Sequence, residues 1–183
     1  MTINGGTVGM SAFKNCDNLS KVTLVNASVS DSAFAECDNL EKVEMRGYAN
    51  IRNGVFYDCP KLSEVTLGTE TFGIGGVCFA GCSNLKKIYN LGVVSSISSI
   101  GGWFLAGVNL ENNTIAANAT AMDDSALSGC NMPEWNLPNV IVSDVKSKNG
   151  FGANAGTVFK CKDGEVVIEA SMPTILFDDG TCV

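Results

Sequence analysis

One pattern of apolar and polar residues recurs along the first three quarters of the chain. The stretch "SAFKNCDNLSKVTL", residues 11–24, returns almost unchanged as "SAFAECDNLEKVEM" at residues 32–45. In each copy a cysteine follows the aromatic residue after three positions and a leucine follows it after six. The aligned copies, 21–25 residues apart, are centred on Phe13, Phe34, Phe56, Phe79, Phe104 and Leu127. A fixed period of this length indicates a stack of similar structural units.

Each copy predicts one short strand and one turn. The phrase L-x-x-V-x-L alternates apolar and polar residues and contains β-branched side chains, which is typical of a strand. The preceding A-F-x-x-C-x-x-L is too short for a stable helix and indicates a turn. A single such coil cannot bury its apolar side chains, whereas stacked coils bury them in continuous rows. The predicted fold class is therefore a repeat solenoid, mainly β, of about six coils of 21–25 residues.

The positions that repeat most faithfully should form the buried ladder. In the fifth copy Gly107 falls on the cysteine position, and Ile100 is displaced from the aliphatic position five residues before the aromatic. The sixth copy frays, with Pro133 at the leucine position. The predicted ladder consists of Phe13, Cys16, Leu19, Phe34, Cys37, Leu40, Phe56, Cys59, Leu62, Phe79, Cys82 and Leu85.

The period stops at about Asn139, so we divide the chain into a solenoid over 1–138 and an appendage over 139–183. Four apolar or alternating stretches follow: "NVIVSDV", "GTVFKC", "EVVIEA" and "PTILFD". The Asn-Gly and Asp-Gly pairs between them supply the positive φ that tight hairpins need. We expect a small β cap here, because the last coil would otherwise expose its core and an open sheet edge.

The repeat I-x-x-x-A-F-x-x-C-x-x-L-x-x-V-x-L resembles the BspA-like leucine-rich repeats of bacterial and protozoan surface proteins, which phages also encode. The resemblance covers residues 3–138, and "GTVFKCKDGEVVIEA" (156–170) is similar to the hairpin that often closes such chains. It implies a curved solenoid used for binding or adhesion without catalysis. This chain departs from the family pattern by lacking the usual proline after the strand and by the degenerate fifth and sixth copies.

Composition and charge exclude several classes of partner. The net charge of −7 disfavours nucleic acid and anionic membrane surfaces, which are themselves negative. The sequence has no apolar run long enough to cross a bilayer, so we expect no membrane insertion. The first residues lack the basic and apolar regions of a signal peptide. Histidine is absent, which removes the commonest general base and zinc ligand, and we expect no metal and no cofactor.

The eight cysteines allow a packing interpretation and several chemical ones. Five occupy the repeated position, where small buried thiols suit a narrow corner of a coil. The only close pair is Cys78 and Cys82, without the second pair or the histidines that zinc sites use. Scattered disulfides or reactive thiols remain alternatives, with Cys182 the most exposed candidate. A buried thiol ladder is the favoured interpretation, and it suggests a reducing or anoxic setting.

Adjacent carboxylates are the main candidates for catalysis. The pairs Asp123-Asp124 and Asp178-Asp179 could act as the two acids of a glycoside hydrolase. Both pairs stand beside serine or glycine in turn-like contexts, so we interpret them as solvated turn residues.

Residues that alternate with the ladder on each strand should point outward and form the candidate binding face. Trp135 is either part of this face or a seal against the cap, and Trp103 is either overpacked or turned outward. The candidate residues are Lys21, Thr23, Lys42, Glu44, Glu64, Thr66, Lys87, Tyr89, Asn112, Thr114 and Trp135.

Three functions are compatible with these patterns. The first is a non-catalytic adhesion module that recognises a protein or a surface glycan at a cell surface, as the resemblance implies. The second is a bacteriophage virion subunit, such as a decoration, fibre or tail-associated protein, which assembles as a homo-oligomer. A chain that starts at its initiating Met1 fits such a small subunit. The third and least favoured is a β-solenoid enzyme acting on glycans.

Overall fold

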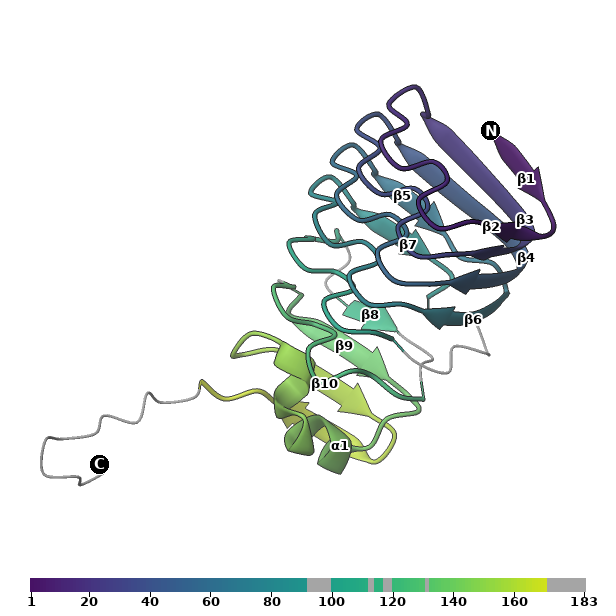
Figure 1. Ribbon diagram of the computed structural model, residues 1–183. Coiled ribbons are helices and arrows are strands. Elements are labelled where there is room, and N and C mark those ends of the chain that lie inside the picture. Colours follow the sequence, from purple (N-terminus) through teal and green to yellow (C-terminus); the bar gives the residue numbers. More distant parts are fainter. Residues whose placement is uncertain (92–99, 112–113, 117–119, 131, 171–183) are drawn as a thin grey trace, which may run out of the picture.

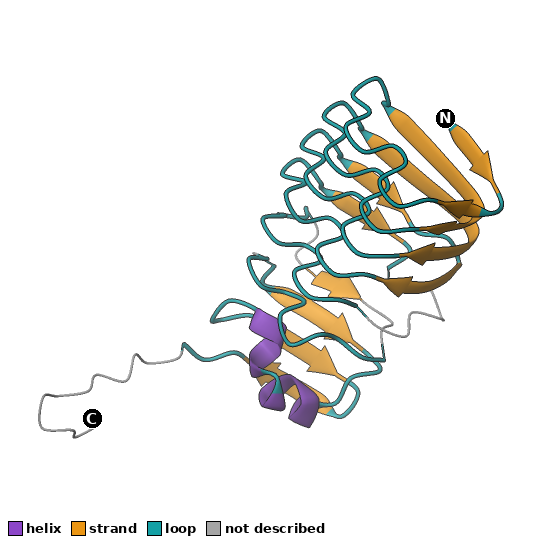
Figure 2. Ribbon diagram, viewed as in Figure 1, coloured by secondary structure: helices purple, strands orange, loops and turns teal. Residues whose placement is uncertain are grey.

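The chain winds into a single stack of coils with parallel β-sheet along its side (Figures 1 and 2). This computed structural model describes residues 1–91, 100–111, 114–116, 120–130 and 132–170, with only the backbone at 114–116. The predicted mainly-β solenoid of about six coils is confirmed. Backbone hydrogen bonds run from each coil to the next, and in the turns they alternate with hydrogen bonds inside the same coil, so most turn amides have a partner.

Sheet A carries the N-terminal coils. Its strands are β1 (Thr2–Asn4), β2 (Thr7–Val8), β3 (Lys21–Val29), β4 (Lys42–Ile51), β5 (Glu64–Thr66), β6 (Glu70–Ile74) and β7 (Lys87–Tyr89). They pair in parallel in the order β1-β3-β4-β5-β7, while β2 pairs with β3 and β6 with β4. The long strands β3 and β4 bend midway, where Asn26 and Gly47 adopt positive φ. Each early coil therefore presents two strand segments that face different directions.

Sheet B carries the C-terminal coils. Its strands are β8 (Thr114–Ala116), β9 (Glu134–Leu137), β10 (Val158–Cys161) and β11 (Gly164–Val167). β8, β9 and β10 are parallel, and β11 returns antiparallel to β10 as the hairpin expected within 156–170. Because β10 adds to β9 in the solenoid direction, the sheet continues past residue 138 before the hairpin ends it.

A helix replaces one of the strands expected in the appendage. The stretch 139–145 was expected to be extended, but α1 spans Val142–Ser147 and a short 3-10 turn follows at Asn149–Gly152. The Val142 amide donates to Asp163 Oδ1 at 2.8 Å, so the hairpin turn caps the start of the helix. The prediction of a strand was wrong because this contact is distant in sequence. The stretch "PTILFD" lies outside the described residues.

The repeated turn reverses the chain through two left-handed residues. They stand two positions before and two positions after the ring position in nearly every coil, where glycine, asparagine or serine is common. The left-handed residues are Ser11, Ser32, Gly54, Val77 and Trp103 before it, and Asn15, Glu36, Asp58, Gly81, Gly107 and Gly129 after it. Glycine adopts this conformation without strain, whereas other side chains adopt it at a cost.

The predicted ladder forms the core. The rings of Phe13, Phe34, Phe56 and Phe79 stack nearly parallel, with centroids 5.2–5.7 Å apart. The nine ladder residues from the second to the fourth coil are buried. In the first coil, Phe13, Cys16 and Leu19 are only half-buried, because fewer coils cover them.

The fifth coil follows a frame one residue later than the aligned repeats indicated. Phe104 leaves the ring stack and packs at 60° against Trp135, with centroids 6.4 Å apart. Leu105 is the fourth residue of this turn, the place that phenylalanine holds in the earlier turns. Ile100 then precedes the ring position by five residues, as in every other coil, and pairs through parallel bridges with the neighbouring coils.

The same shift corrects the cysteine position of this coil. Gly107 was expected there, but the fully buried residue three positions after Leu105 is Val108. Gly107 instead occupies the second left-handed position of the turn. A valine side chain fills the space that cysteine fills elsewhere, so the ladder is continuous through the fifth coil.

Candidate binding surface

The predicted face lies on the outer side of sheet A. Parallel register aligns Lys21, Lys42, Glu64 and Lys87 in one row across four coils. Thr23, Glu44, Thr66 and Tyr89 form the next row. β4 extends these rows with the outward side chain of Arg46 and, just past its bend at Gly47, with that of Tyr48. We call this set the strand surface: Lys21, Lys42, Glu44, Arg46, Tyr48, Glu64, Thr66, Lys87 and Tyr89.

Most charges on the strand surface are paired between coils. Lys21 lies 3.6 Å from Glu44, and Lys42 lies 2.9 Å from Glu64. Lys87 pairs with Glu111 at 3.8 Å. The hydrogen bond from Lys42 holds the pKa of Glu64 below its usual range. Exposed pairs of this kind add little stability, but they cancel charge, so the surface offers shape and polarity more than net charge.

Three predicted members of the face are not available on it as expected. Thr23 is only 8% exposed and lies in register between Thr2 and Glu44. Asn112 lies outside the described residues. Thr114 is described only by its backbone, which pairs with Glu134.

Trp135 was predicted to point outward as a member of the binding face, and this prediction was wrong. Its side chain is 1% exposed and packs against Phe104. The prediction counted eight residues from Leu127, but the return of the sixth coil is shorter than the earlier ones. A shift of one residue moves a strand side chain to the opposite side of the sheet. The alternative interpretation of Trp135 as an internal seal agrees with its burial.

Exposed aromatic side chains divide between the two sides of the solenoid. Tyr48, Phe72 and Tyr89 lie on sheet A with 38%, 54% and 45% of their surface exposed. Tyr57 and Trp103 are exposed on the turn side. Trp103 therefore points outward, which decides between the two orientations considered for it.

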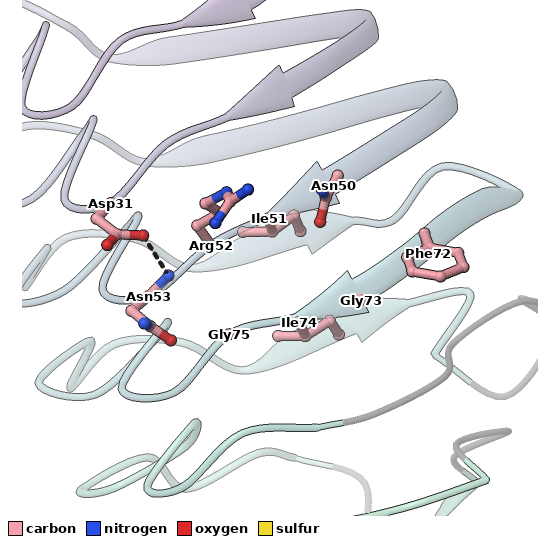
Figure 3. Close-up of a pocket in the computed structure, with 9 residues that line it drawn as sticks. All are labelled: Asp31, Asn50, Ile51, Arg52, Asn53, Phe72, Gly73, Ile74 and Gly75. Atoms are coloured by element: carbon pink, nitrogen blue, oxygen red, sulfur yellow. Dashed lines mark hydrogen bonds between the residues drawn. The ribbon is translucent and has the colours of Figure 1, made fainter.

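A hollow that the repeat pattern did not predict lies beside the second strand segment (Figure 3). It measures about 320 Å³. Its lining residues are Asp31, Asn50, Ile51, Arg52, Asn53, Phe72, Gly73, Ile74 and Gly75. Arg52 lies between Asp31 and Asn50, and Phe72 lies on the next coil beyond Asn50. One Asp31 carboxylate oxygen accepts from the Asn53 amide at 3.2 Å.

A β-bulge creates this hollow. Ala49 pairs with Thr71 and Asn50 with Gly73, so the register between β4 and β6 skips Phe72. A bulge re-aims the side chain of the extra residue, and here it leaves an exposed phenylalanine next to a glycine. A Cβ atom at Gly73 would meet no other atom within 4 Å. The missing side chain of Gly73 is therefore what keeps the hollow open.

The ladder cysteines serve packing and hydrogen bonding. Cys37, Cys59 and Cys82 donate from Sγ to the ring-position carbonyl of the preceding coil at 3.1, 3.2 and 3.1 Å. All seven described cysteines are free thiols, and Cys182 lies outside the described residues. Burial raises the pKa of Cys78 to about 12 and that of Cys130 to about 11. These thiols are therefore protonated and unreactive near neutral pH.

The acidic pair Asp123-Asp124 makes structural contacts. Asp123 Oδ1 accepts from the Ser125 amide at 3.1 Å and from its hydroxyl at 2.9 Å, which lowers the pKa of Asp123. Asp124 forms an ion pair with Lys148 at 3.2 Å. Asp178 and Asp179 lie outside the described residues. Over the described part of the chain, His, Cys, Asp and Glu side chains do not gather in threes that could hold a metal ion.

Two solved structures share this fold. A leucine-rich repeat protein from Bacteroides ovatus has 22% identity and a TM-score of 0.66, with 88% of this chain and 41% of that chain covered. A leucine-rich cell surface protein from Faecalibacterium prausnitzii has 15% identity and a TM-score of 0.50, with 88% and 47% covered. The chain thus spans less than half the length of either structure.

No helix in the described residues has the length and apolarity to span a membrane.

A search of curated proteins gave no match to this sequence. The family model for the BspA-type leucine-rich repeat region matches residues 6–134 in six copies. This range contains the stacked rings, the cysteine ladder and the strand surface described above. The chain belongs to the BspA-type leucine-rich repeat family.

Proposed function

We propose that this chain is a non-catalytic recognition module that binds a protein partner at a cell surface through the strand surface. The observation that carries the proposal is the exposure of Tyr89 and Arg46 on the first strand segments of sheet A, with exposed Tyr48 just past the bend of β4. Tyrosine and arginine are enriched among the few residues that carry most of the binding energy of protein interfaces. A flat sheet of paired charges offers a broad area for a protein rather than a pocket for a small molecule.

The scaffold supports this role. The strand surface is backed by fully buried residues such as Val43 and Val65, so binding would order few side chains and lose little entropy. The chain has no histidine, and Asp123 and Asp124 are engaged in structural contacts. The cell-surface setting is supported by the description of the Faecalibacterium structure as a cell surface protein. The virion alternative stays a prediction.

Photocrosslinking tests the proposal directly. A photoreactive phenylalanine analogue replaces Tyr89 on the strand surface or, as the matched control, Tyr57 on the turn side. Each variant is incubated with intact bacterial and epithelial cells, irradiated, and analysed for adducts by mass spectrometry. We expect position 89 to crosslink to a protein, and we expect an excess of the unlabelled, unmodified chain to suppress this adduct. Equal labelling from position 57, or no adduct that the unlabelled chain suppresses, would refute the strand surface as the site.

A further inference from the structure

We propose that the hollow beside Phe72 is a second site, which binds neutral pyranose units of a glycan chain. It uses residues separate from those of the proposed protein-binding surface. The site consists of Asp31, Asn50, Arg52, Phe72 and Gly73.

The shape of the site suits an extended ligand. The hollow of about 320 Å³ adjoins another of about 380 Å³, and both are lined by Asp31, Asn50 and Arg52. Each lies in the size range of small-ligand sites, roughly 300–1,000 Å³. The three shared polar residues therefore stand between two neighbouring hollows, an arrangement that suits consecutive units of one linear chain.

The chemical groups that line the site suit a sugar. Phe72 offers an exposed aromatic ring at one end, and a pyranose has a face of C–H groups that packs on such a ring. Asn50 donates and accepts, Arg52 donates from a planar fork, and Asp31 accepts. Within the described residues, the Arg52 guanidinium has neither an ion-pair partner nor a hydrogen-bond partner. Neighbouring hydroxyl groups of a sugar match the planar guanidinium, because each of their two oxygens can accept a hydrogen bond from one of its N–H groups.

The charges at the site favour a neutral ligand. Asp31 and Arg52 give the site one negative and one positive group, so that neither sign is in excess there. An anionic ligand would be attracted by Arg52 but repelled by Asp31. The net charge of the chain, −7, would repel it as well. A neutral sugar uses both groups without this opposition. The second hollow adds the hydroxyls of Thr7, Ser28 and Ser30, which also suit a neutral polyol.

Gly73 provides a sharp test. Gly73 lies in a strand, its φ is outside the left-handed region, and a Cβ there meets open space. Gly73→Leu should therefore fold normally and fill the hollow. Phe72→Ala removes the stacking ring, Arg52→Ala removes the donor, and Tyr57→Ala on the turn side is the matched control.

The probes are xylotetraose, cellotetraose, mannotetraose and, as the acidic comparison, tetragalacturonate, titrated into the purified full chain by saturation-transfer NMR. We expect at least one neutral tetrasaccharide to bind. Gly73→Leu, Phe72→Ala and Arg52→Ala should each weaken it by about tenfold or more, with Tyr57→Ala and the thermal midpoints unchanged. The proposal is overturned if no neutral probe binds, if only tetragalacturonate binds, or if Gly73→Leu binds like the unmodified chain.

Discussion

Substitution of Cys59 tests whether the ladder thiols hold the coils together by hydrogen bonds as well as by packing. Cys59 is fully buried, and its Sγ donates to the Phe34 carbonyl at 3.2 Å. Within the described residues, that carbonyl has no other hydrogen-bond donor. Cys59→Ala thus removes a buried side-chain atom and leaves a buried acceptor unsatisfied.

The expected cost follows from these two losses. Burial of a group the size of the sulfur contributes about 1 kcal/mol, and an unsatisfied buried carbonyl costs about 1–3 kcal/mol. Cys59→Ala should therefore lower the free energy of unfolding by about 2–4 kcal/mol. The measurement is equilibrium urea unfolding under reducing conditions, followed by circular dichroism with the slope checked for constancy.

Cys130→Ala is the matched control. Cys130 holds the same position in the sixth coil and is also buried, but within the described residues its hydrogen-bond partner is the Met132 backbone rather than a carbonyl of the preceding coil. The Leu105 carbonyl of the preceding coil is already satisfied by the Val108 amide. The loss in the free energy of unfolding should be smaller for Cys130→Ala than for Cys59→Ala, by at least about 1 kcal/mol. Equal costs would refute the role of the thiol–carbonyl bond and leave the cysteines as packing residues alone.

Three further predictions concern the core, the thiols and the turns. Trp135→Ala should destabilise by about 3–5 kcal/mol in urea unfolding, whereas exposed Trp103→Ala should change stability by less than about 0.5 kcal/mol; similar losses would contradict the inward assignment. The folded-state pKa of Cys78 and Cys130 lies above the ordinary value near 9. The stability that each buried thiol contributes is therefore fully present below pH 9 and is lost as the pH rises toward the folded-state pKa. By pH 10 the loss should be about 1 kcal/mol per thiol. Replacing both with alanine should make the pH profile less steep, while Cys37 and Cys59, whose pKa values are also raised, keep their share of the slope. Glu36→Gly should raise the thermal midpoint, with about 1 kcal/mol gained from relief of the left-handed conformation; a lower midpoint would count against it.

The sequence predicted the solenoid, the ladder and most of the strand surface because these repeat. The left-handed glycines of the turns belong to the same repeat and could have been used to set its frame. Ile100 also carried the correct signal: counted from Leu105, it stands five residues before the ring position like its counterparts. The alignment of the fifth coil on Phe104 followed the aromatic ring rather than the five-residue spacing from Ile100, so it placed that coil one residue too early.

The hollow could not be predicted from the repeat. It depends on the pairing of β6 with β4, where a bulge at Phe72 places two consecutive residues outside. A bulge is a property of two strands together, and neither strand alone signals it. Likewise, α1 depends on a cap from Asp163, which is distant in sequence. Trp135 was misassigned because a constant return length was extrapolated into a shorter coil.

The central claim is that the inward positions build the scaffold while the strand surface recognises a partner. The most direct measurement is the affinity for the protein crosslinked from position 89, determined for the unmodified chain and the double variant Tyr48→Ala/Tyr89→Ala. We expect the affinity to fall by about tenfold or more, with an unchanged thermal midpoint and with Tyr57→Ala binding normally. An unchanged affinity of the double variant, or a loss that appears only together with a lower midpoint, would contradict the claim.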